Sequence, residues 1–426
     1  MGGRPSSTRL AWLGQLRVWR PGLYARSSAV LFGWLLVRAA AQTLLVVLLA
    51  RTLGARSYGV YVAALAVAGF FAPMAGLGLQ GVILRDGSRA PETLGDLLDH
   101  ALRLYWRALL ASWLVGAAVA LLALPRAIPA LLLVLLVGTE IAAGSLIEIL
   151  GRVEQALQRS AGFGALMAGL ALVRLFALVA WEAAGTPTVG GWIFAYGAAS
   201  LLYAAAVLWR ARRRLRPTAD RAAPDWAMAA QGRPFAVGAV ALRVQSEFNK
   251  PVLAAIGPAL AANLSLAQRA VDVASLPLVA LQDALWSRLY ASHEPGRRLL
   301  RTGGALLALA LLGGVALTVL APLLPQLLGH GFEATAQLLR WLAWLPSLQL
   351  LRNLGNAHLI ATGHARRLTG VYVLGALLGM LATVLLVDRI GLEGAIAAAY
   401  ATELVTLAAQ SVLYFTITAH AARARP

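Results

Sequence analysis

Apolar segments long enough to cross a lipid bilayer recur along the whole chain, and they restrict its fold more than any other feature. A membrane-spanning helix needs about 20 predominantly apolar residues. Twelve stretches qualify, and eleven to thirteen is the range that the less clean ones allow. They are roughly 29–50, 58–79, 104–124, 129–150, 163–184, 190–210, 235–256, 260–288, 303–321, 336–360, 368–388 and 393–418. Because backbone groups within a bilayer must bond to one another, the sequence predicts an all-α polytopic membrane protein.

The charge of the chain agrees with this interpretation. Only 13% of the 426 residues are charged, yet the net charge is +19. If the N-terminus is cytoplasmic, 25 Lys and Arg residues fall in inner segments and only Arg51, Arg56, Arg126 and Arg389 in outer loops. Such a bias is typical of cytoplasmic loops, so we expect both termini inside and no nucleic-acid partner. The absence of cysteine excludes disulfides and cysteine-ligated zinc.

Polar segments divide the chain into five predicted parts. Residues 1–28 carry five arginines, and Leu10, Leu13 and Leu16 lie three residues apart, which indicates a basic amphipathic segment on the cytoplasmic surface; a disordered tail is the alternative. The longest polar interval, 211–234, separates a bundle over 29–210 from a second over 235–418, and 419–426 form a tail. A shift of about 203 residues places "LLARTLGARSYG" near "VLAAIGPALAAN" and Arg85 on Arg288, which indicates a parallel repeat.

Two short motifs carry no functional prediction. "GLGLQG", from Gly76 to Gly81, matches the dinucleotide fingerprint but follows a membrane span instead of a strand, so we interpret it as a helix end. The six histidines are scattered without ligand spacing, so no metal site is predicted.

Charged residues inside the spans carry most of the functional information. Arg243, Glu247 and Lys250 lie at positions i, i+4 and i+7 of the seventh span and share one helix face. An ion at mid-bilayer costs about 2.5–3.5 kcal/mol, so exposing all three to lipid would cost on the order of 8–10 kcal/mol. That face must therefore line protein or water. The eighth span adds Arg269 and Asp272, and the first span adds Arg38 with Gln42 one turn further on.

These charges have two interpretations. Arg243 with Glu247 and Arg269 with Asp272 could be internal ion pairs that join helices. Lys250 and Arg38 have no obvious partner on their own helices, and four cations against two anions favour an anionic ligand. Most of the other charges inside spans are expected to join helices. Among them, Glu140, Glu148 and Glu403 are candidates for binding a coupling ion, H+ or Na+.

Two neighbours of the charged face have structural predictions. Pro251 predicts a kink in the seventh span because it lacks a backbone donor. Asn249 lies roughly opposite the charged face and is predicted to pack against another helix.

Two signatures resemble the Wzx-type polysaccharide flippases, a branch of the multidrug/oligosaccharidyl-lipid/polysaccharide superfamily. In that family an L-G-x-x-x-Y-G turn joins the first two spans and a G-L-x-x-x-x-x-R stretch ends the second. The turn here is Leu53, Gly54, Tyr58 and Gly59, and the stretch is Gly78, Leu79 and Arg85. In "LAQRAVDVASLPL", Arg269 matches the arginine of a Y-x-x-A-x-R motif, whose tyrosine is replaced by Leu264 or Leu266.

The resemblance implies a fold and a function. We expect about 12 transmembrane helices in two pseudo-symmetric six-helix bundles around a central cavity. The chain would move an undecaprenyl-diphosphate-linked oligosaccharide from the cytoplasmic to the periplasmic leaflet of a bacterial inner membrane, by alternating access. The product would be a surface polysaccharide such as O-antigen, a lipopolysaccharide component, or exopolysaccharide. The partners implied are this lipid-linked oligosaccharide, membrane lipid and the polysaccharide polymerase machinery.

The site predicted from these arguments binds substrate and performs no catalysis, so neither an enzyme nor a cofactor is expected. The substrate-binding residues are Arg38, Gln42, Arg243, Glu247, Lys250, Arg269 and Asp272, with Arg85 and Arg288 at the cytoplasmic rim. The main alternative is an ion-coupled exporter of drugs or small molecules from the same superfamily. A membrane-embedded glycan polymerase or ligase is a further alternative. Such an enzyme needs catalytic groups on a substantial loop, whereas the longest outer loop, 321–335, holds one histidine and one carboxylate, His330 and Glu333.

Overall fold

The computed structural model describes residues 23–185, 188–217, 226–290, 295–361 and 365–423, and within these ranges every regular element is a helix. In chain order they are α2 (Leu23–Ala75), α3 (Leu79–Arg89), the 3₁₀ turn η2 (Pro91–Thr93), α4 (Leu94–Ala123), α5 (Ala130–Ala156), α6 (Ser160–Ala183), α7 (Val189–Arg214), α8 (Trp226–Glu247), α9 (Asn249–Ile256), α10 (Pro258–Tyr290), α11 (Pro295–Leu320), α12 (Leu323–Leu328), α13 (Ala334–Leu342), α14 (Leu345–Ala361) and α15 (Ala365–Arg423).

The helices account for twelve crossings, as the sequence predicts. Eight helices in the described part of the chain are long and apolar enough to span a membrane. Two of them, α2 and α15, bend near their middles and supply two crossings each. Two more crossings are broken helices, α8 with α9 and α13 with α14. The protein is therefore a multi-pass membrane protein with the predicted all-α fold.

The bend in α2 lies within the first family signature. Gly54 adopts φ 70° and ψ 166°, a conformation that only glycine accepts readily. The chain thus reverses direction there, and the two halves of α2 form the first two crossings. In the second half of the chain, Gly257 separates α9 from α10, 203 positions later. The two halves turn at corresponding positions, as the predicted repeat requires.

The seventh crossing is interrupted where the proline predicts it. Pro251 has no N–H to donate to the carbonyl of Glu247, four residues earlier. The helix breaks at that point: α8 ends at Glu247 and α9 begins at Asn249. The interruption therefore falls at Phe248, between Glu247 and Lys250, and not at Pro251, which follows these charged residues.

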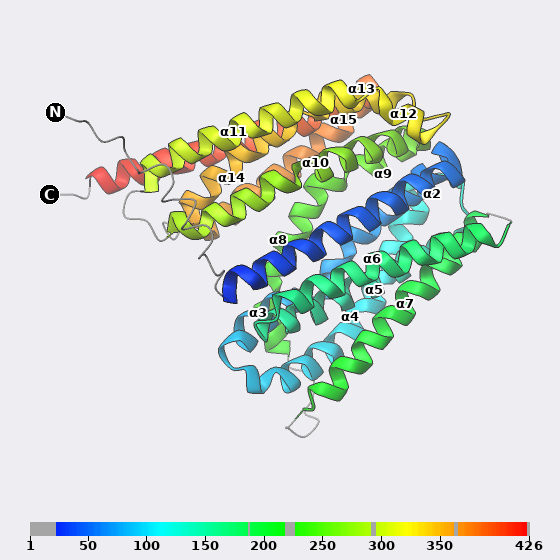
Figure 1. Cartoon of the computed structure of the whole chain (residues 1–426), viewed down its shortest axis with the longest axis horizontal. Helices are drawn as coiled ribbons and strands as arrows, with labels where there is room; N and C mark the ends of the chain where they lie inside the picture. The colour runs from blue at the N-terminus through cyan, green and yellow to red at the C-terminus, as the bar shows by residue number, and fades with distance from the viewer. Residues whose placement is uncertain (1–22, 186–187, 218–225, 291–294, 362–364, 424–426) are drawn as a thin grey trace, which may run out of the picture.

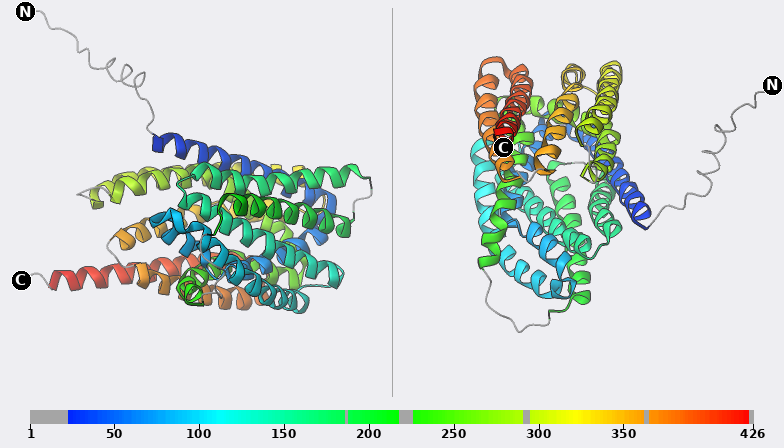
Figure 2. Two further views of the ribbon diagram at one scale, coloured as in Figure 1. Left: turned by 90° about the horizontal axis from the view of Figure 1, so that it is seen from below. Right: turned by 90° about the vertical axis from the view of Figure 1, so that its left-hand side faces the viewer.

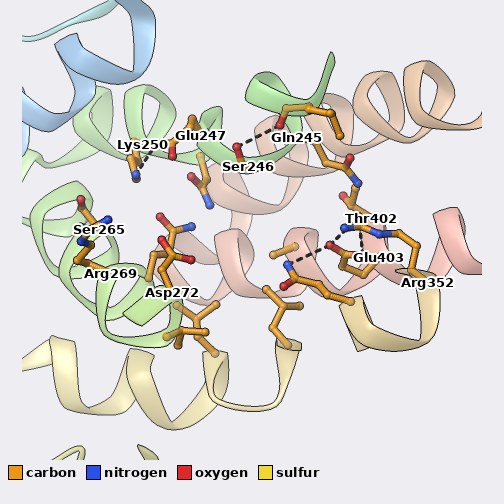
Figure 3. Close-up of a pocket in the computed structure, with 18 of the residues that line it drawn as sticks. Gln245, Ser246, Glu247, Lys250, Ser265, Arg269, Asp272, Arg352, Thr402 and Glu403 are labelled. Carbon is orange, nitrogen blue, oxygen red and sulfur yellow. Dashed lines mark hydrogen bonds and ion pairs between the residues drawn. The ribbon is translucent and has the colours of Figure 1, made fainter. Parts of the chain in front are cut away.

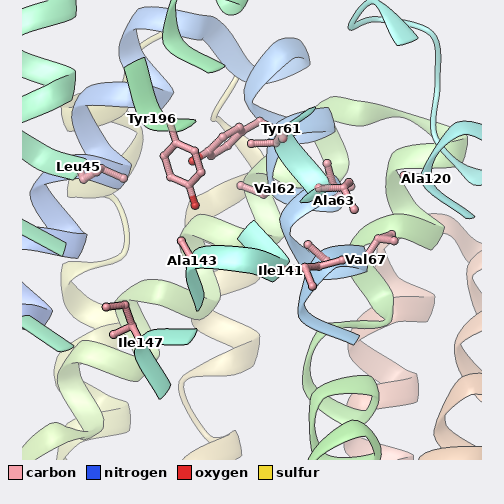
Figure 4. Packing of buried hydrophobic residues seen from close by; sticks show 14 of the residues in the cluster. Leu45, Tyr61, Val62, Ala63, Val67, Ala120, Ile141, Ala143, Ile147 and Tyr196 are labelled. Atoms are coloured by element: carbon pink, nitrogen blue, oxygen red, sulfur yellow. The ribbon is translucent and has the colours of Figure 1, made fainter. Parts of the chain in front are cut away.

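Two lobes pack side by side along their lengths (Figures 1 and 2). The N-lobe contains α2 to α7, and the C-lobe contains α8 to α15. The N-lobe core joins aliphatic and aromatic side chains, among them Tyr61, Val67, Ile141 and Tyr196 (Figure 4). The two lobes meet chiefly through α2 and α10, which run against each other. The first residues of α2 and the last of α15 lie at the same end of the molecule (Figure 1).

Several predicted boundaries differ from the observed helix ends. Helices α7 and α8 extend into the predicted linker 211–234, so only 215–225 remain between them, and 218–225 lie outside the described residues. Of the predicted N-terminal segment, 1–22 lie outside the described residues. The "GLGLQG" motif spans the turn between α2 and α3, where Gly78 adopts φ 67°, so it is a helix end as predicted.

Candidate functional site

A cavity of about 510 Å³ opens between the lobes on the N-lobe side, and we call it the N-lobe cavity. The first half of α2 contributes Arg38 and Gln42, and the second half contributes Tyr58 and Tyr61. Polar residues of α5, α6 and α7 form the opposite wall. Helices α8, α9 and α10 of the C-lobe close it. The cavity therefore lies on the lobe interface, where the sequence places the charged spans.

Positive charge exceeds negative charge on the wall of this cavity. Six cationic side chains line it, against three carboxylates. The cations are Arg38, Arg152, Arg174, Arg243, Lys250 and Arg269, and the carboxylates are Glu140, Glu148 and Glu247.

Each of the three carboxylates has its own cation. Glu140 of α5 accepts from Arg174 of α6 at 2.7 Å and from the Tyr196 hydroxyl of α7. Glu148 lies 3.8 Å from Arg152 on the same helix. Glu247 forms an ion pair with Lys250 across the break between α8 and α9. These pairs neutralise three cations and leave three arginines in excess.

The arginines in excess are Arg38, Arg243 and Arg269. Arg269 donates a 2.8 Å hydrogen bond to Gln42 Oε1, and its buried Nε has no hydrogen-bond partner among the described residues. Arg38 and Arg243 have no ion-pair partner among the described residues. The charges that repel Arg38 most strongly are those of Arg243 and Arg269. Three guanidinium groups from α2, α8 and α10 therefore line one cavity, and none of them forms an ion pair with a carboxylate of the described residues.

A second cavity of about 360 Å³ adjoins the first on the C-lobe side, and we call it the C-lobe cavity (Figure 3). Glu247, Lys250 and Arg269 line both cavities and so form the wall between them. Asp272 lines only the C-lobe cavity. Deeper in the C-lobe, Arg352 Nη1 lies 2.9 Å from Glu403 Oε2, and Gln349 donates to the same carboxylate at 3.3 Å.

The predicted site residues are thus brought together, but at two cavities instead of one. Arg38, Gln42 and Arg243 line the N-lobe cavity, and Asp272 lines the C-lobe cavity. Arg243, Glu247 and Lys250 share one cavity wall, as their spacing predicts.

The predictions for Lys250 and Asn249 were wrong, and the alternative interpretation of internal ion pairs finds no support. Lys250 has a partner on its own crossing, Glu247, because the i, i+3 spacing survives the helix break. Neither Arg243 with Glu247 nor Arg269 with Asp272 forms an ion pair among the described residues. Asn249, the first residue of α9, lines the C-lobe cavity.

Other lining residues lie outside the set of substrate-binding residues that the sequence predicts. Glu140, Arg174, Arg352 and Glu403 join helices, and each also lines a cavity. The signal that could have located them is their helix spacing: polar residues on several spans at similar depth indicate one shared cavity. Gln245, Gln268 and Gln349 carry the same signal more weakly, because neutral amides cost less than ions inside a membrane.

The predicted cytoplasmic rim is described on one side only. Arg85 of α3 donates to Asp86 at 2.7 and 2.8 Å and to Gln231 of α8 at 2.6 Å. The hydrogen bonds from Arg85 lower the pKa of the Asp86 carboxyl. Arg85 therefore joins the N-lobe to the start of α8. The side chain of Arg288 lies outside the described residues.

Comparisons with known proteins identify the fold. No family model and no curated protein sequence match the chain. An inward-facing MATE family multidrug resistance transporter of the MOP superfamily matches with a TM-score of 0.72 at 13% identity, covering 91% of this chain and 96% of that one. The lipid II flippase MurJ in an inward closed conformation matches with a TM-score of 0.74 at 11% identity, covering 91% and 87%. An outward-facing MATE transporter of the same superfamily matches with a lower TM-score, 0.62, at 12% identity, covering 92% and 96%.

These solved structures share their architecture with this chain over almost its whole length. The fold is therefore that of the MATE and MurJ transporters, and it agrees better with the inward conformations than with the outward one.

Proposed function

We propose that the chain is a flippase that moves a polyprenyl-diphosphate-linked oligosaccharide across the membrane. The observation that carries the proposal is the excess of three arginines, Arg38, Arg243 and Arg269, on the wall of the N-lobe cavity. Guanidinium groups bind phosphate oxygens through paired hydrogen bonds, and three of them more than neutralise the two negative charges of a diphosphate that links a prenyl chain to a sugar.

The chemistry of the cavity favours an anionic over a cationic substrate. A site for organic cations would present carboxylates free to pair with the ligand. Here each carboxylate of the N-lobe cavity already has a cation of this chain. An anion entering the cavity would instead relieve the mutual repulsion of Arg38, Arg243 and Arg269.

The fold supports a transport cycle of alternating access. Substrate sites of such transporters lie near the bilayer midplane between two repeats, and rocking of the repeats changes the exposed side. The cavities described above occupy the equivalent place between the lobes. One solved protein with this fold is described as a flippase of lipid II. By analogy, the diphosphate and sugars of the substrate would pass through the cavities while the prenyl chain stays in lipid.

The membrane potential favours outward movement of a diphosphate. Moving one charge through 100 mV changes the free energy by about 2.3 kcal/mol. A headgroup of two negative charges leaving an inside-negative cytoplasm is therefore driven outward unless counter-ions travel with it. Glu140 and Glu403 remain candidates for binding a coupling ion, although each is ion-paired in this structure.

Arginine substitutions at the N-lobe cavity test the proposal. Arg38→Gln and Arg243→Gln each remove one charge-assisted contact worth about 1.5–3 kcal/mol. We expect headgroup translocation, or surface polysaccharide at equal protein level, to fall by about ten- to one-hundredfold. Arg126→Gln is the matched control, because Arg126 is exposed between α4 and α5. Full activity in both cavity variants would contradict the diphosphate site.

The alternative of an ion-coupled exporter follows from the same fold, since the MATE transporters share it. It predicts that the purified chain in liposomes moves a cationic dye against a proton or sodium gradient. Dye transport that persists in Arg243→Gln would favour this alternative over the flippase.

A further inference from the structure

Four side-chain amides from four helices line the C-lobe cavity. They are Gln245 of α8, Asn249 of α9, Gln268 of α10 and Gln349 of α14. No side-chain amide other than Gln42 lines the N-lobe cavity within the described part of the chain. The two adjoining cavities therefore differ in chemistry, one rich in arginine and the other in amides.

Three of these amides hold buried polar atoms that the protein does not satisfy. Gln245 Nε2, Asn249 Oδ1 and Gln268 Oε1 are buried and have no hydrogen-bond partner among the described residues. An unsatisfied buried donor or acceptor costs about 1–3 kcal/mol. Since native structures satisfy nearly all such groups, these three atoms indicate a ligand or water in the cavity.

The charge of the C-lobe cavity argues against an ion as that ligand. Three cations, Lys250, Arg269 and Arg352, line it with an equal number of carboxylates, Glu247, Asp272 and Glu403. Arg269, Lys250 and Glu247 belong to the wall that both cavities share, and Asp272 is the carboxylate that the C-lobe cavity adds opposite Arg269. Within this set Lys250 pairs with Glu247 and Arg352 with Glu403. The described lining of the cavity therefore has no formal charge in excess, in contrast to that of the N-lobe cavity.

A hydroxyl group matches the unsatisfied atoms better than a charged group does. An amide presents both a donor and an acceptor, and a hydroxyl likewise both donates and accepts. A saccharide presents several hydroxyls at once, so it can form hydrogen bonds with amides from different helices. The cavity volume of about 360 Å³ falls in the range of small-ligand sites, about 300–1,000 Å³.

We propose that the C-lobe cavity is a sugar subsite, which binds the saccharide unit next to the diphosphate. Gln245, Asn249 and Gln268 are its specificity-determining residues. This inference rests on the proposed function. It adds an assignment of the diphosphate to the N-lobe cavity and of the first sugar to the C-lobe cavity. The common wall of Glu247, Lys250 and Arg269 brings the two subsites into contact, so one ligand spans both.

The division has a consequence for selectivity. A site built to hydrogen-bond a hydroxyl discriminates strongly against a ligand that lacks it, because its own buried polar groups are then left unpaired. The diphosphate would supply affinity common to all lipid-linked sugars. The amides would decide which first sugar is accepted.

Binding of prenyl diphosphates with and without a sugar tests the subsite. The probes are farnesyl diphosphate alone and farnesyl diphosphate linked to glucose, galactose or N-acetylglucosamine, titrated calorimetrically into the full-length protein in detergent. We expect at least one sugar-bearing probe to bind about tenfold more tightly than farnesyl diphosphate, which corresponds to about 1.4 kcal/mol. In Gln245→Met and Gln268→Met this gain disappears, while the affinity for farnesyl diphosphate is unchanged.

The controls separate this inference from the proposed function. Arg243→Gln should weaken all probes alike, and Gln337→Met, on the exposed surface of α13, should alter none. Asn249→Leu provides an independent variant should one glutamine variant not fold. Sugar-bearing probes that bind no better than farnesyl diphosphate, or a gain that survives the amide variants, would overturn the sugar subsite alone. Failure of farnesyl diphosphate itself to bind would overturn the diphosphate site and the sugar subsite with it.

Discussion

Single residues inside the membrane divide into those that hold helices together and those left free for a ligand. Arg174 shows the first role: it joins Glu140, donates to Ser200 Oγ at 2.9 Å, and stacks on Tyr196 with 4.5 Å from Cζ to the ring centroid. Its partners come from α5 and α7, so one arginine of α6 connects three helices. Arg38 and Arg243 illustrate the second role, because their charge finds no ion-pair partner in the described part of the protein.

Removing the carboxylate of this network should destabilise the N-lobe. In Glu140→Gln the guanidinium of Arg174 loses its counter-charge, which costs about 1–3 kcal/mol. The matched control is Glu148→Gln on the same helix. Glu148 lies at a longer distance, 3.8 Å, from Arg152, and its side chain is 40% exposed. We therefore expect a clear fall in the melting temperature of the purified protein for Glu140→Gln and little change for Glu148→Gln. Equal melting temperatures would show that the network is not structural.

Among the helices, the turn that carries the L-G-x-x-x-Y-G motif lies where the two lobes touch. Gly54 forms the bend of α2, and Gly59 lies in the following turn against the start of α10. A Cβ atom built on Gly59 would lie only 1.8 Å from the carbonyl oxygen of Pro258. The backbones of α2 and α10 are therefore in contact at this end, which the bend places opposite the described chain ends. This contact closes the end of the lobe interface that lies opposite the described chain ends.

A side chain at position 59 should open that end. Gly59→Ala cannot be accommodated against backbone, so we expect the population to shift toward conformations in which α2 and α10 separate. Spin labels on Arg56→Cys and Leu327→Cys, both exposed and near the two sides of the contact, report the change as a longer distance. The chain has no native cysteine, so labelling is specific.

The control for this experiment is Gly33→Ala in the same helix. A Cβ at Gly33 meets nothing within 4 Å, so its distance distribution should match that of the parent. Unchanged distances in Gly59→Ala would contradict the role of this contact in closing that end of the lobe interface.

For the whole molecule, the two lobes repeat an architecture while differing in chemistry. Each lobe buries a glutamate, an arginine and a tyrosine together: Glu140, Arg174 and Tyr196 in one, and Glu403, Arg352 and Tyr372 in the other. Three crossings of each lobe supply them, but the residue types are distributed differently among the crossings. Both lobes therefore contain a polar cluster that joins three crossings, but the glutamate, arginine and tyrosine of the two clusters do not lie on corresponding crossings.

The orientation of the whole protein in the membrane is predicted from the charges of its loops. The distribution of Lys and Arg places the turn at Glu92 inside and the turn at Arg126 outside, and α4 separates the two. We expect an impermeant maleimide to label Arg126→Cys in intact cells and Glu92→Cys only after permeabilisation. Both residues are exposed, so their labelling reports the side of the membrane. The reverse labelling pattern would show that the protein has the opposite orientation in the membrane, and it would contradict the predicted one.

The number of crossings, their bends and the residues that must avoid lipid follow from the order of amino acids alone. Apolar length fixes a crossing because the bilayer has a fixed thickness, and Gly54 and Pro251 fix a bend because their backbone restrictions act locally. The cost of burying charge is likewise local, which is why their positions within the spans suffice to assign Arg38, Arg243, Lys250 and Arg269 to a cavity. None of these properties depends on which helices are neighbours.

Which of these charges lack an ion-pair partner depends on how the helices pack. Lys250 is neutralised by Glu247 because the helix break leaves them in contact, whereas Arg243, one turn away, has no ion-pair partner among the described residues. The same packing divides one expected site into two cavities and turns Asn249 toward the second. Helix spacing leaves both Arg243 and Lys250 within reach of Glu247, and it does not supply the distances of a few ångströms to residues on other helices that decide which charge is paired.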